Sequence, residues 1–231
     1  MIESVLEASG LTKNYATTRA LSDVDLRVQR GESLAIMGAS GSGKTTLLHL
    51  LAGIVAPDAG TVRFTPASGV SLDVTGGSES VRSRLRRERF GFVFQQGLLI
   101  PELTAIENVA LARMINGEPR RAAVEHAAGW MASLGLAGME DRRIGELSGG
   151  QAQRVAIARA QVTGAELVFA DEPTGALDTQ TSAEVMDALL WSTTGQGRTL
   201  IVVTHDADVA ARCSRTIQVS DGRIVNAEVS A

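Results

Sequence analysis

The chain has 231 residues, 44% hydrophobic and 21% charged, a composition typical of a globular protein that can bury a large core. Its formal net charge of −4 argues against binding nucleic acid through a broad basic face. The single cysteine, Cys213, excludes an internal disulfide and fits a reducing compartment. No uncharged apolar run approaches the roughly 18 residues of a membrane span, and the acidic N-terminus does not resemble a signal peptide. We therefore expect a soluble, cytoplasmic protein.

Two kinds of strand are predicted in chain order. Apolar and polar residues alternate over 21–28 and around Arg63, which indicates half-buried strands. Three other runs, at 34–37, 167–170 and 200–203, are apolar without alternation, as in strands that are buried on both faces. The sequence therefore predicts an α/β fold with a mostly parallel sheet and an antiparallel β edge.

A phosphate-binding loop follows the first of these apolar runs and precedes a predicted buried helix over 45–57. Its glycines let backbone N–H groups turn toward phosphate oxygens, and the helix N-terminus adds partial positive charge. Lys44 supplies a full charge to the phosphates, and the Thr45 hydroxyl suits Mg²⁺. The predicted nucleotide-binding residues are Gly38, Ala39, Ser40, Gly41, Ser42, Gly43, Lys44, Thr45 and Thr46.

The remaining elements are predicted more coarsely. Residues 65–77 are polar and are expected to form a surface loop, whereas 98–165 is mainly helical, for instance over 120–134. Asp221-Gly222 predicts a hairpin between strands over 216–219 and 223–225. Residues after about 226 are expected to be loose.

Two adjacent carboxylates, Asp171 and Glu172, follow the apolar run 167–170. The first is suited to hold Mg²⁺, and the second to act as a general base toward a water molecule. A solvated pair of acids is the alternative. Their position behind a buried strand in a phosphate-loop protein favours the catalytic interpretation.

The sequence LSGGQ occupies 147–151, where Ser148 and Gln151 have the spacing of a capping box that begins a helix. An ordinary helix start is one interpretation. A capped helix with Gly149 and Gly150 in its first turn is also an anion site. Because the phosphate loop already serves this chain's nucleotide, a second site is useful if it faces the phosphate of another molecule.

With these motifs, the chain closely resembles the ABC-transporter nucleotide-binding family from about residue 5 to 225. The resemblance implies one ABC ATPase domain over 1–231, with a core at about 1–95 and 166–231 and a helical lobe at about 96–165. It implies hydrolysis of ATP with Mg²⁺ as cofactor, and an ATP-dependent, head-to-tail homodimer.

The resemblance also implies roles for single residues. Tyr15 matches an aromatic residue that stacks on adenine, although an ordinary surface tyrosine is an equal alternative from residue type. Gln95 matches a ligand of Mg²⁺ and the attacking water, and His205 matches a contact of the γ-phosphate. Together with Glu172 these two form the expected catalytic set, and Thr45, Gln95 and Asp171 form the expected metal set. The residues expected to contact ATP across the dimer are Ser148, Gly149, Gly150, Gln151 and Asp178.

A finer resemblance rests on 91–96 and 172–178, which look like the branch containing MacB, LolD and FtsE-type ATPases. It implies a MacB/FtsX-like integral membrane permease as a separate partner, a peripheral location at the cytoplasmic face of the membrane, and export as the task. The alternative is a regulatory ATPase that signals across the membrane to a cell-wall enzyme. A DNA-repair or translation ATPase is disfavoured, because the chain has one copy of the motifs and no long insertion between them. The cargo and the direction of movement depend on the permease.

Several other features are given structural interpretations. The arginines of 82–89 are expected to form a solvated helix face, with a membrane or partner contact as the alternative. Trp130 and Trp191 are expected to be packing residues, and Cys213 an inert helix residue. Leu98 and Leu99 are predicted either to close the core of the helical lobe or to line a groove for the permease.

Overall fold

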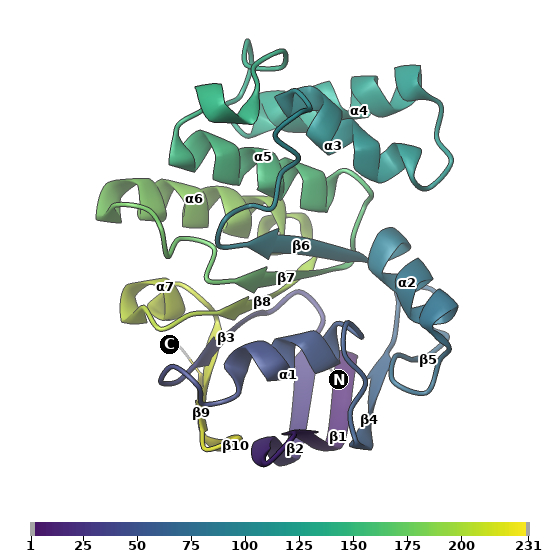
Figure 1. The fold of residues 1–231 in the computed structure, drawn as a ribbon, viewed down its shortest axis with the longest axis vertical. Coiled ribbons are helices and arrows are strands. Elements are labelled where there is room, and N and C mark those ends of the chain that lie inside the picture. The colour runs from purple at the N-terminus through teal and green to yellow at the C-terminus, as the bar shows by residue number, and fades with distance from the viewer. Residues whose placement is uncertain (1–2, 230–231) are drawn as a thin grey trace.

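The computed structural model describes residues 3–229 and places two sheets and a set of helices in layers (Figure 1). The larger sheet has six strands in the order β10-β9-β3-β8-β7-β6. All neighbours in it are parallel except the hairpin of β9 and β10, so the predicted mostly parallel sheet is confirmed. The strands are β3 (Ser33–Met37), β6 (Phe90–Phe94), β7 (Leu167–Asp171), β8 (Thr199–Val203), β9 (Arg215–Ser220) and β10 (Arg223–Val229).

The smaller sheet is antiparallel and has the order β2-β1-β4-β5. Its strands are β1 (Ser4–Tyr15), β2 (Thr18–Gln29), β4 (Ala59–Phe64) and β5 (Leu72–Asp73). Burial alternates along β2 as predicted for 21–28. The prediction of a loop over all of 65–77 was wrong at β5, because Leu72 and Asp73 pair with the edge of β4 opposite Phe64 and Arg63.

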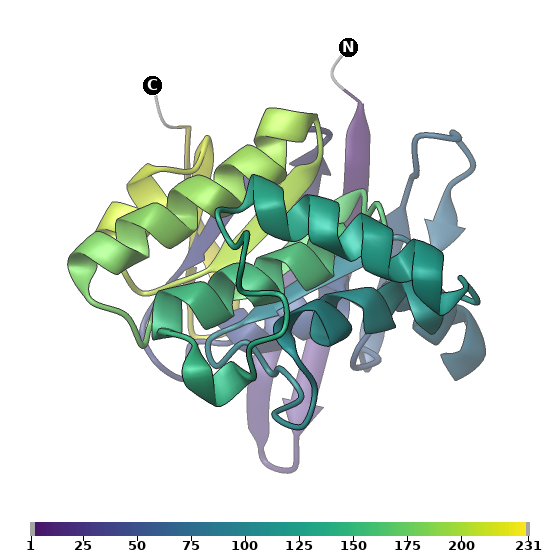
Figure 2. The same cartoon turned by 90° about the horizontal axis from the view of Figure 1, so that it is seen from above.

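Seven α-helices are present in the described part of the chain. Figure 2 shows the fold from above, with α3 to α6, in teal and green, in front of the sheets. They are α1 (Lys44–Leu51), α2 (Glu79–Glu88), α3 (Ala105–Met114), α4 (Arg120–Ser133), α5 (Gly149–Gln161), α6 (Thr179–Ser192) and α7 (Ala207–Ala211), with short 3₁₀ turns η1 (Ile144–Glu146) and η2 (Thr194–Gln196). The predicted buried helix over 45–57 is α1, but the prediction was wrong at its C-terminal end, because α1 ends at Leu51, shortly before Gly53, whose φ is +63°.

The six-stranded sheet separates two apolar cores. Leu167 and Phe169 of β7 face the core that contains α1 and the antiparallel sheet, whereas Val168 and Ala170 face the core beneath α3 to α6. This alternation explains why the run 167–170 is apolar at every position. Both faces of β7 are therefore covered. Its last residue, Asp171, is only partly buried and lies at the carboxyl end of the strand.

The C-terminal hairpin is confirmed, but its second strand is longer than predicted. β10 continues through residues 227–229, which pair with Ile217, Thr216 and Arg215, so the expectation of a loose chain after 226 was wrong there. Residues 230 and 231 lie outside the described part. Within 3–229 no helix is both long and apolar enough to cross a bilayer.

Two structural interpretations of side chains can be compared with the fold. Trp130 and Trp191 pack edge to face with ring centroids 6.5 Å apart, so the packing prediction is confirmed. The prediction that Cys213 lies in a helix was wrong, because α7 ends two residues before it. Burial raises the pKa of its thiol to about 11, and the thiol therefore stays protonated at neutral pH.

Candidate active site

The phosphate loop joins β3 to α1 and turns sharply at Gly43, the N-cap of α1. Gly43 has φ +106°, and a Cβ there would lie 2.4 Å from the carbonyl oxygen of Ala20. Only glycine fits this close approach of two backbones. The loop is thus seated against the start of β2, which belongs to the other sheet.

Lys44 is 8% exposed, and its Nζ donates to the carbonyl oxygens of Gly38 at 2.7 Å and Ala39 at 2.9 Å. The loop's own carbonyls therefore hold the ammonium group at the loop. A buried cation surrounded by inward-turning backbone is suited to an anionic ligand.

A cavity of about 610 Å³ opens beside this loop. It brings six of the nine predicted loop residues together with Gln95, Glu172 and His205, which follow β6, β7 and β8. Gly38, Ala39 and Ser42 are not part of its lining. Neighbouring parallel strands end at the same edge of the sheet, so side chains far apart in sequence meet there. The lining consists of Thr18, Ala20, Ser40, Gly41, Gly43, Lys44, Thr45, Thr46, Gln95, Glu172 and His205.

Glu172 directly follows β7 and has a positive φ of +46°, which is uncommon for a residue with a side chain. Its amide donates to the Val203 carbonyl at 2.9 Å, which ties it to β8. Its carboxylate lies 2.8 Å from Nδ1 of His205 and 3.4 Å from Oγ1 of Thr204. These partners fix the orientation of the carboxylate in the cavity.

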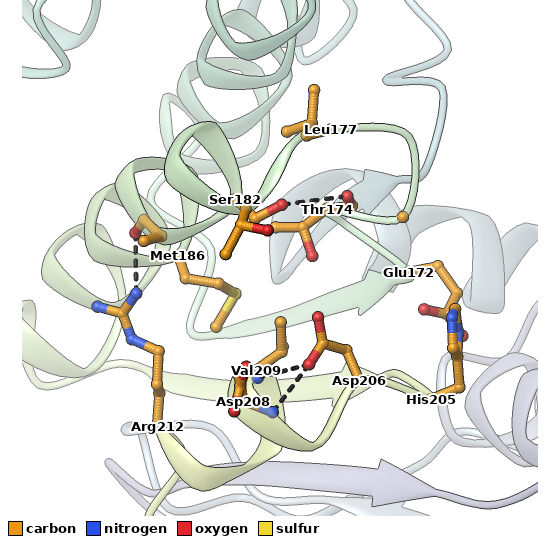
Figure 3. A pocket seen from close by; sticks show the side chains of 13 residues that line it. Glu172, Thr174, Leu177, Ser182, Met186, His205, Asp206, Asp208, Val209 and Arg212 are labelled. Carbon is orange, nitrogen blue, oxygen red and sulfur yellow. Dashed lines mark hydrogen bonds and ion pairs between the residues drawn. The ribbon is translucent and has the colours of Figure 1, made fainter.

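Glu172 and His205 also line a second cavity of about 410 Å³, between the start of α6 and α7. Figure 3 shows the two side chains at one end of it, with Ser182 and Met186 on α6. The candidate base is therefore accessible from two sides.

Asp171 is the last residue of β7, and the Thr45 hydroxyl donates to its Oδ1 at 3.4 Å. Burial raises the pKa of Asp171, while the nearby His49 and Thr45 favour its charged form. Threonine hydroxyl, aspartate carboxylate and glutamine amide oxygens are the hard ligands that Mg²⁺ prefers, so Thr45, Asp171 and Gln95 fit this ion. Within residues 3–229 no three His, Cys, Asp or Glu side chains cluster to form a metal cage of their own.

The structure does not bring every predicted residue into the first cavity. Tyr15, at the end of β1, is 47% exposed, and Lys13 Nζ lies 5.6 Å from its ring centroid. Ser148 caps α5, and its reciprocal hydrogen bonds with Gln151 confirm the predicted capping box. Asp178 caps α6 by accepting from Thr181. These residues, with Gly149 and Gly150, are absent from the lining of the cavity that holds Lys44.

Three residues near the site were not predicted from the sequence. Thr18 and Ala20 line the cavity from the start of β2, and Thr204 contacts Glu172. Thr204 directly precedes His205 and follows a buried strand, which is a signal that could have revealed it. Thr18 and Ala20 carry no local signal, because packing between the two sheets places them.

The fold and this site define a nucleotide-binding α/β protein with a phosphate loop. The sequence matches the ABC transporter family over residues 21–175. The macrolide export ATP-binding/permease protein MacB of Rhodopseudomonas palustris (strain BisB18) is 43% identical over 229 residues, which are 97% of this chain and 34% of that protein. The probable syringafactin export ATP-binding/permease protein SyfD of Pseudomonas syringae pv. syringae is 41% identical over 97% of this chain and 34% of its own length.

A solved structure is also similar. The dimeric, post-hydrolysis form of the ATP-binding cassette MJ0796, bound to ADP and Pi, has a TM-score of 0.86 and 34% identity, and the match covers 98% of this chain and 99% of that one. The chain belongs to the ABC transporter family, as a MacB-like ATPase with the ABC ATPase fold. It spans about a third of the length of the curated relatives that it matches.

Proposed function

We propose that this chain is the ATP-hydrolysing part of a MacB-like exporter, that it dimerises head to tail on ATP, and that it drives a membrane permease. The observation that carries the proposal is the incomplete cavity. It holds Lys44, Glu172 and His205, whereas the second anion site at Ser148 is absent from its lining.

In the proposed binding step, residues 38–46 hold the phosphates and Tyr15 stacks on the adenine. Lys44 exchanges its loop carbonyl partners for phosphate oxygens, which are stronger acceptors because they carry full charge. Thr45, Asp171 and Gln95 hold Mg²⁺, which when bound neutralises phosphate charge.

In the proposed hydrolysis step, Glu172 orients the attacking water and accepts its proton. Once ATP is bound, His205 turns from the Glu172 carboxylate that it contacts in the structure and donates its ring N–H to the γ-phosphate oxygens. Gln95 orients the water from the side of β6.

We propose that Ser148, Gly149, Gly150, Gln151 and Asp178 complete the site of a second copy. The capped N-terminus of α5 supplies free N–H groups and partial positive charge to the partner's nucleotide. The dimeric relative supports this arrangement. We propose one domain over 1–231, in which the helical lobe at about 96–165 carries Ser148, Gly149, Gly150 and Gln151 and the core carries Asp178.

The permease partner and the location are proposed from the relatives. Their names join an ATP-binding part with an export permease, for a macrolide in one case and for syringafactin in another. We propose that this chain works at the cytoplasmic face of the membrane and is held there through a MacB-like permease. The cargo contacts the permease and not the ATPase.

A mixing experiment tests the composite site. Lys44→Ala inactivates a chain's own phosphate loop, and Ser148→Arg blocks the site that it offers to its partner. Each variant alone should be inactive, but a heterodimer of the two contains one intact site, so mixing them should restore ATP hydrolysis. Mixing Lys44→Ala with Glu172→Gln is the control, because no heterodimer of these two has an intact site.

The expected result is phosphate release only from the first mixture, with a rate per chain that rises with protein concentration. Absence of restoration, together with full activity of Ser148→Arg alone, would show that a single chain contains the complete site.

A further inference from the structure

Helix α5 contacts the segment around Gln95 on both sides. Before Gln95, the buried Gln153 side chain donates from Nε2 to the Phe94 carbonyl at 2.9 Å. After it, the Arg159 guanidinium donates to the carbonyls of Gly97 at 2.7 Å and Leu98 at 2.6 Å. These three hydrogen bonds are made by the helix whose N-cap is Ser148.

The backbone after Gln95 has a conformation that needs such support. Gly97 and Leu98 have φ of +65° and +46°, and a leucine rarely adopts this left-handed conformation. The Leu98 side chain is 59% exposed, so packing does not hold it in place. A strained backbone conformation persists only where surrounding contacts hold it. Here the two hydrogen bonds from the Arg159 guanidinium hold the backbone of Gly97 and Leu98.

The segment that contains Gln95 is thus attached both to the core sheet and to helix α5. Phe94 pairs in register with Asp171, which anchors the segment to the core sheet. Gln153 and Arg159 anchor it to α5, a rigid helix of 13 residues, about 20 Å long. If the N-terminus of α5 shifts when it meets a partner's nucleotide, Gln95 must shift relative to Asp171 and Glu172, or these hydrogen bonds must break.

We infer that Gln153 and Arg159 are positioning residues that transmit the placement of α5 to Gln95. The inference rests on the proposed function, in which Ser148 meets the second nucleotide and Gln95 contacts Mg²⁺ and water. Neither residue touches substrate; they set where the Gln95 amide lies. A purely structural role, in which both residues only stabilise the helix, is the competing interpretation.

The test is a double-variant cycle on the full chain with Mg·ATP, measuring kcat, the Kd for ATP and the melting temperature. Arg159→Ala should lower kcat on the order of 10- to 100-fold, as for a misplaced catalytic group. The Kd for ATP should stay unchanged, because the phosphate loop is intact. Arg159→Lys keeps the charge but loses the bidentate geometry of the guanidinium. Its kcat should lie between those of the unchanged chain and of Arg159→Ala.

The coupling is measured by adding Gln95→Ala. If Arg159 acts through Gln95, the double variant should be no slower than Gln95→Ala alone. Gln153→Ala should behave as Arg159→Ala does. Arg198→Ala is the matched control, because Arg198 also donates to a backbone carbonyl, that of Gln161, but away from Gln95. It should lower the melting temperature and leave kcat unchanged.

The outcomes are distinct. If Gln95→Ala slows hydrolysis but Arg159→Ala and Gln153→Ala do not, the inference is overturned while the proposed function stands. Effects of Arg159 and Gln95 that multiply in the double variant also overturn it. Full activity in Gln95→Ala contradicts the role of Gln95 in the proposed function, and the inference falls with it.

Discussion

The Oε1 atom of Glu172 lies 2.8 Å from Nδ1 of His205, so the candidate base and the candidate γ-phosphate contact form one hydrogen-bonded unit. The histidine is the more exposed of the two, with 69% of its side chain accessible against 21% for the glutamate. The glutamate is therefore the better fixed member, and His205 is free to turn toward a ligand. This difference in exposure supports the proposed roles of Glu172 as the base and of His205 as the ligand contact.

The Glu172→Gln variant should lose hydrolysis by about 10²-fold or more, because the base is removed while the shape is kept. ATP binding should persist, and a long-lived dimer should form in size-exclusion chromatography with ATP. Glu166→Gln is the matched control at the other end of β7, where Glu166 pairs with Arg30 and Arg89. Near-normal turnover in Glu172→Gln would exclude it as the base.

Lys44→Ala should act on binding rather than on the chemical step. A charged hydrogen-bond donor to phosphate is lost, so the Kd for ATP should rise by about 10- to 100-fold. Lys44→Arg should not restore binding, because a planar guanidinium does not fit where the compact ammonium is held by Gly38 and Ala39. Titration with a fluorescent ATP analogue measures the Kd of each variant. An unchanged Kd in Lys44→Ala would contradict the placement of the phosphates.

Asp178 has two separable roles, as the cap of α6 and as a predicted contact across the dimer. Hydrogen bonds from the Thr181 hydroxyl and amide hold the pKa of Asp178 below its usual value. Its contribution to stability is therefore present above the unfolded-state pKa and is lost only as the pH falls through the lower folded-state value.

Asp178→Asn keeps the cap and removes the charge, whereas Asp178→Ala removes both. We expect Asp178→Asn to lower ATP hydrolysis and to lower the melting temperature at neutral pH only slightly, because it loses the charge but keeps an acceptor for the Thr181 amide. Asp178→Ala should lower both more strongly. Thermal unfolding and phosphate release provide the two readouts. Full hydrolysis in Asp178→Asn would limit the residue to its capping role.

Leu98 and Leu99 were both predicted either to line a groove or to close the core. Their burial in the structure differs. Leu98 is exposed, and Leu99 is partly buried against the core beneath the helices. Leu98→Ser should therefore leave the melting temperature unchanged and reduce the stimulation of ATPase activity by co-expressed permease in membranes. Leu99→Ser should destabilise the chain by about 1–3 kcal/mol. Normal stimulation in Leu98→Ser would remove Leu98 from the permease contact.

Much of the fold could be predicted because its signals are local. The apolar runs of β3, β7 and β8, the alternation in β2 and the capping box at Ser148 each lie within a few residues. The phosphate loop carries its chemistry in consecutive positions. Short, periodic or contiguous patterns of this kind are readable without knowledge of the rest of the chain.

The parts that were missed depend on long-range pairing. β5 exists because β4 offers an open edge, and β10 extends to Val229 because β9 continues beside it. Likewise, Arg159 and Gln153 lie about sixty positions from the segment they hold, so their hydrogen bonds have no sequence signature. Tertiary contacts, not local preference, decide such features.

The phosphate loop and the C-terminal hairpin both pack closely against a single backbone group, the carbonyl of Ala20. A Cβ at Gly43 or at Gly222 would lie 2.4 Å or 2.7 Å from that oxygen. The tight fit uses the main chain of Ala20, and this half-buried residue also lines the cavity. This matters for protein engineering. A substitution at position 20 changes the cavity lining while the backbone contact with the loop is kept, so this position is suited to reshaping the pocket for modified nucleotides. Positions 43 and 222 do not accept a side chain.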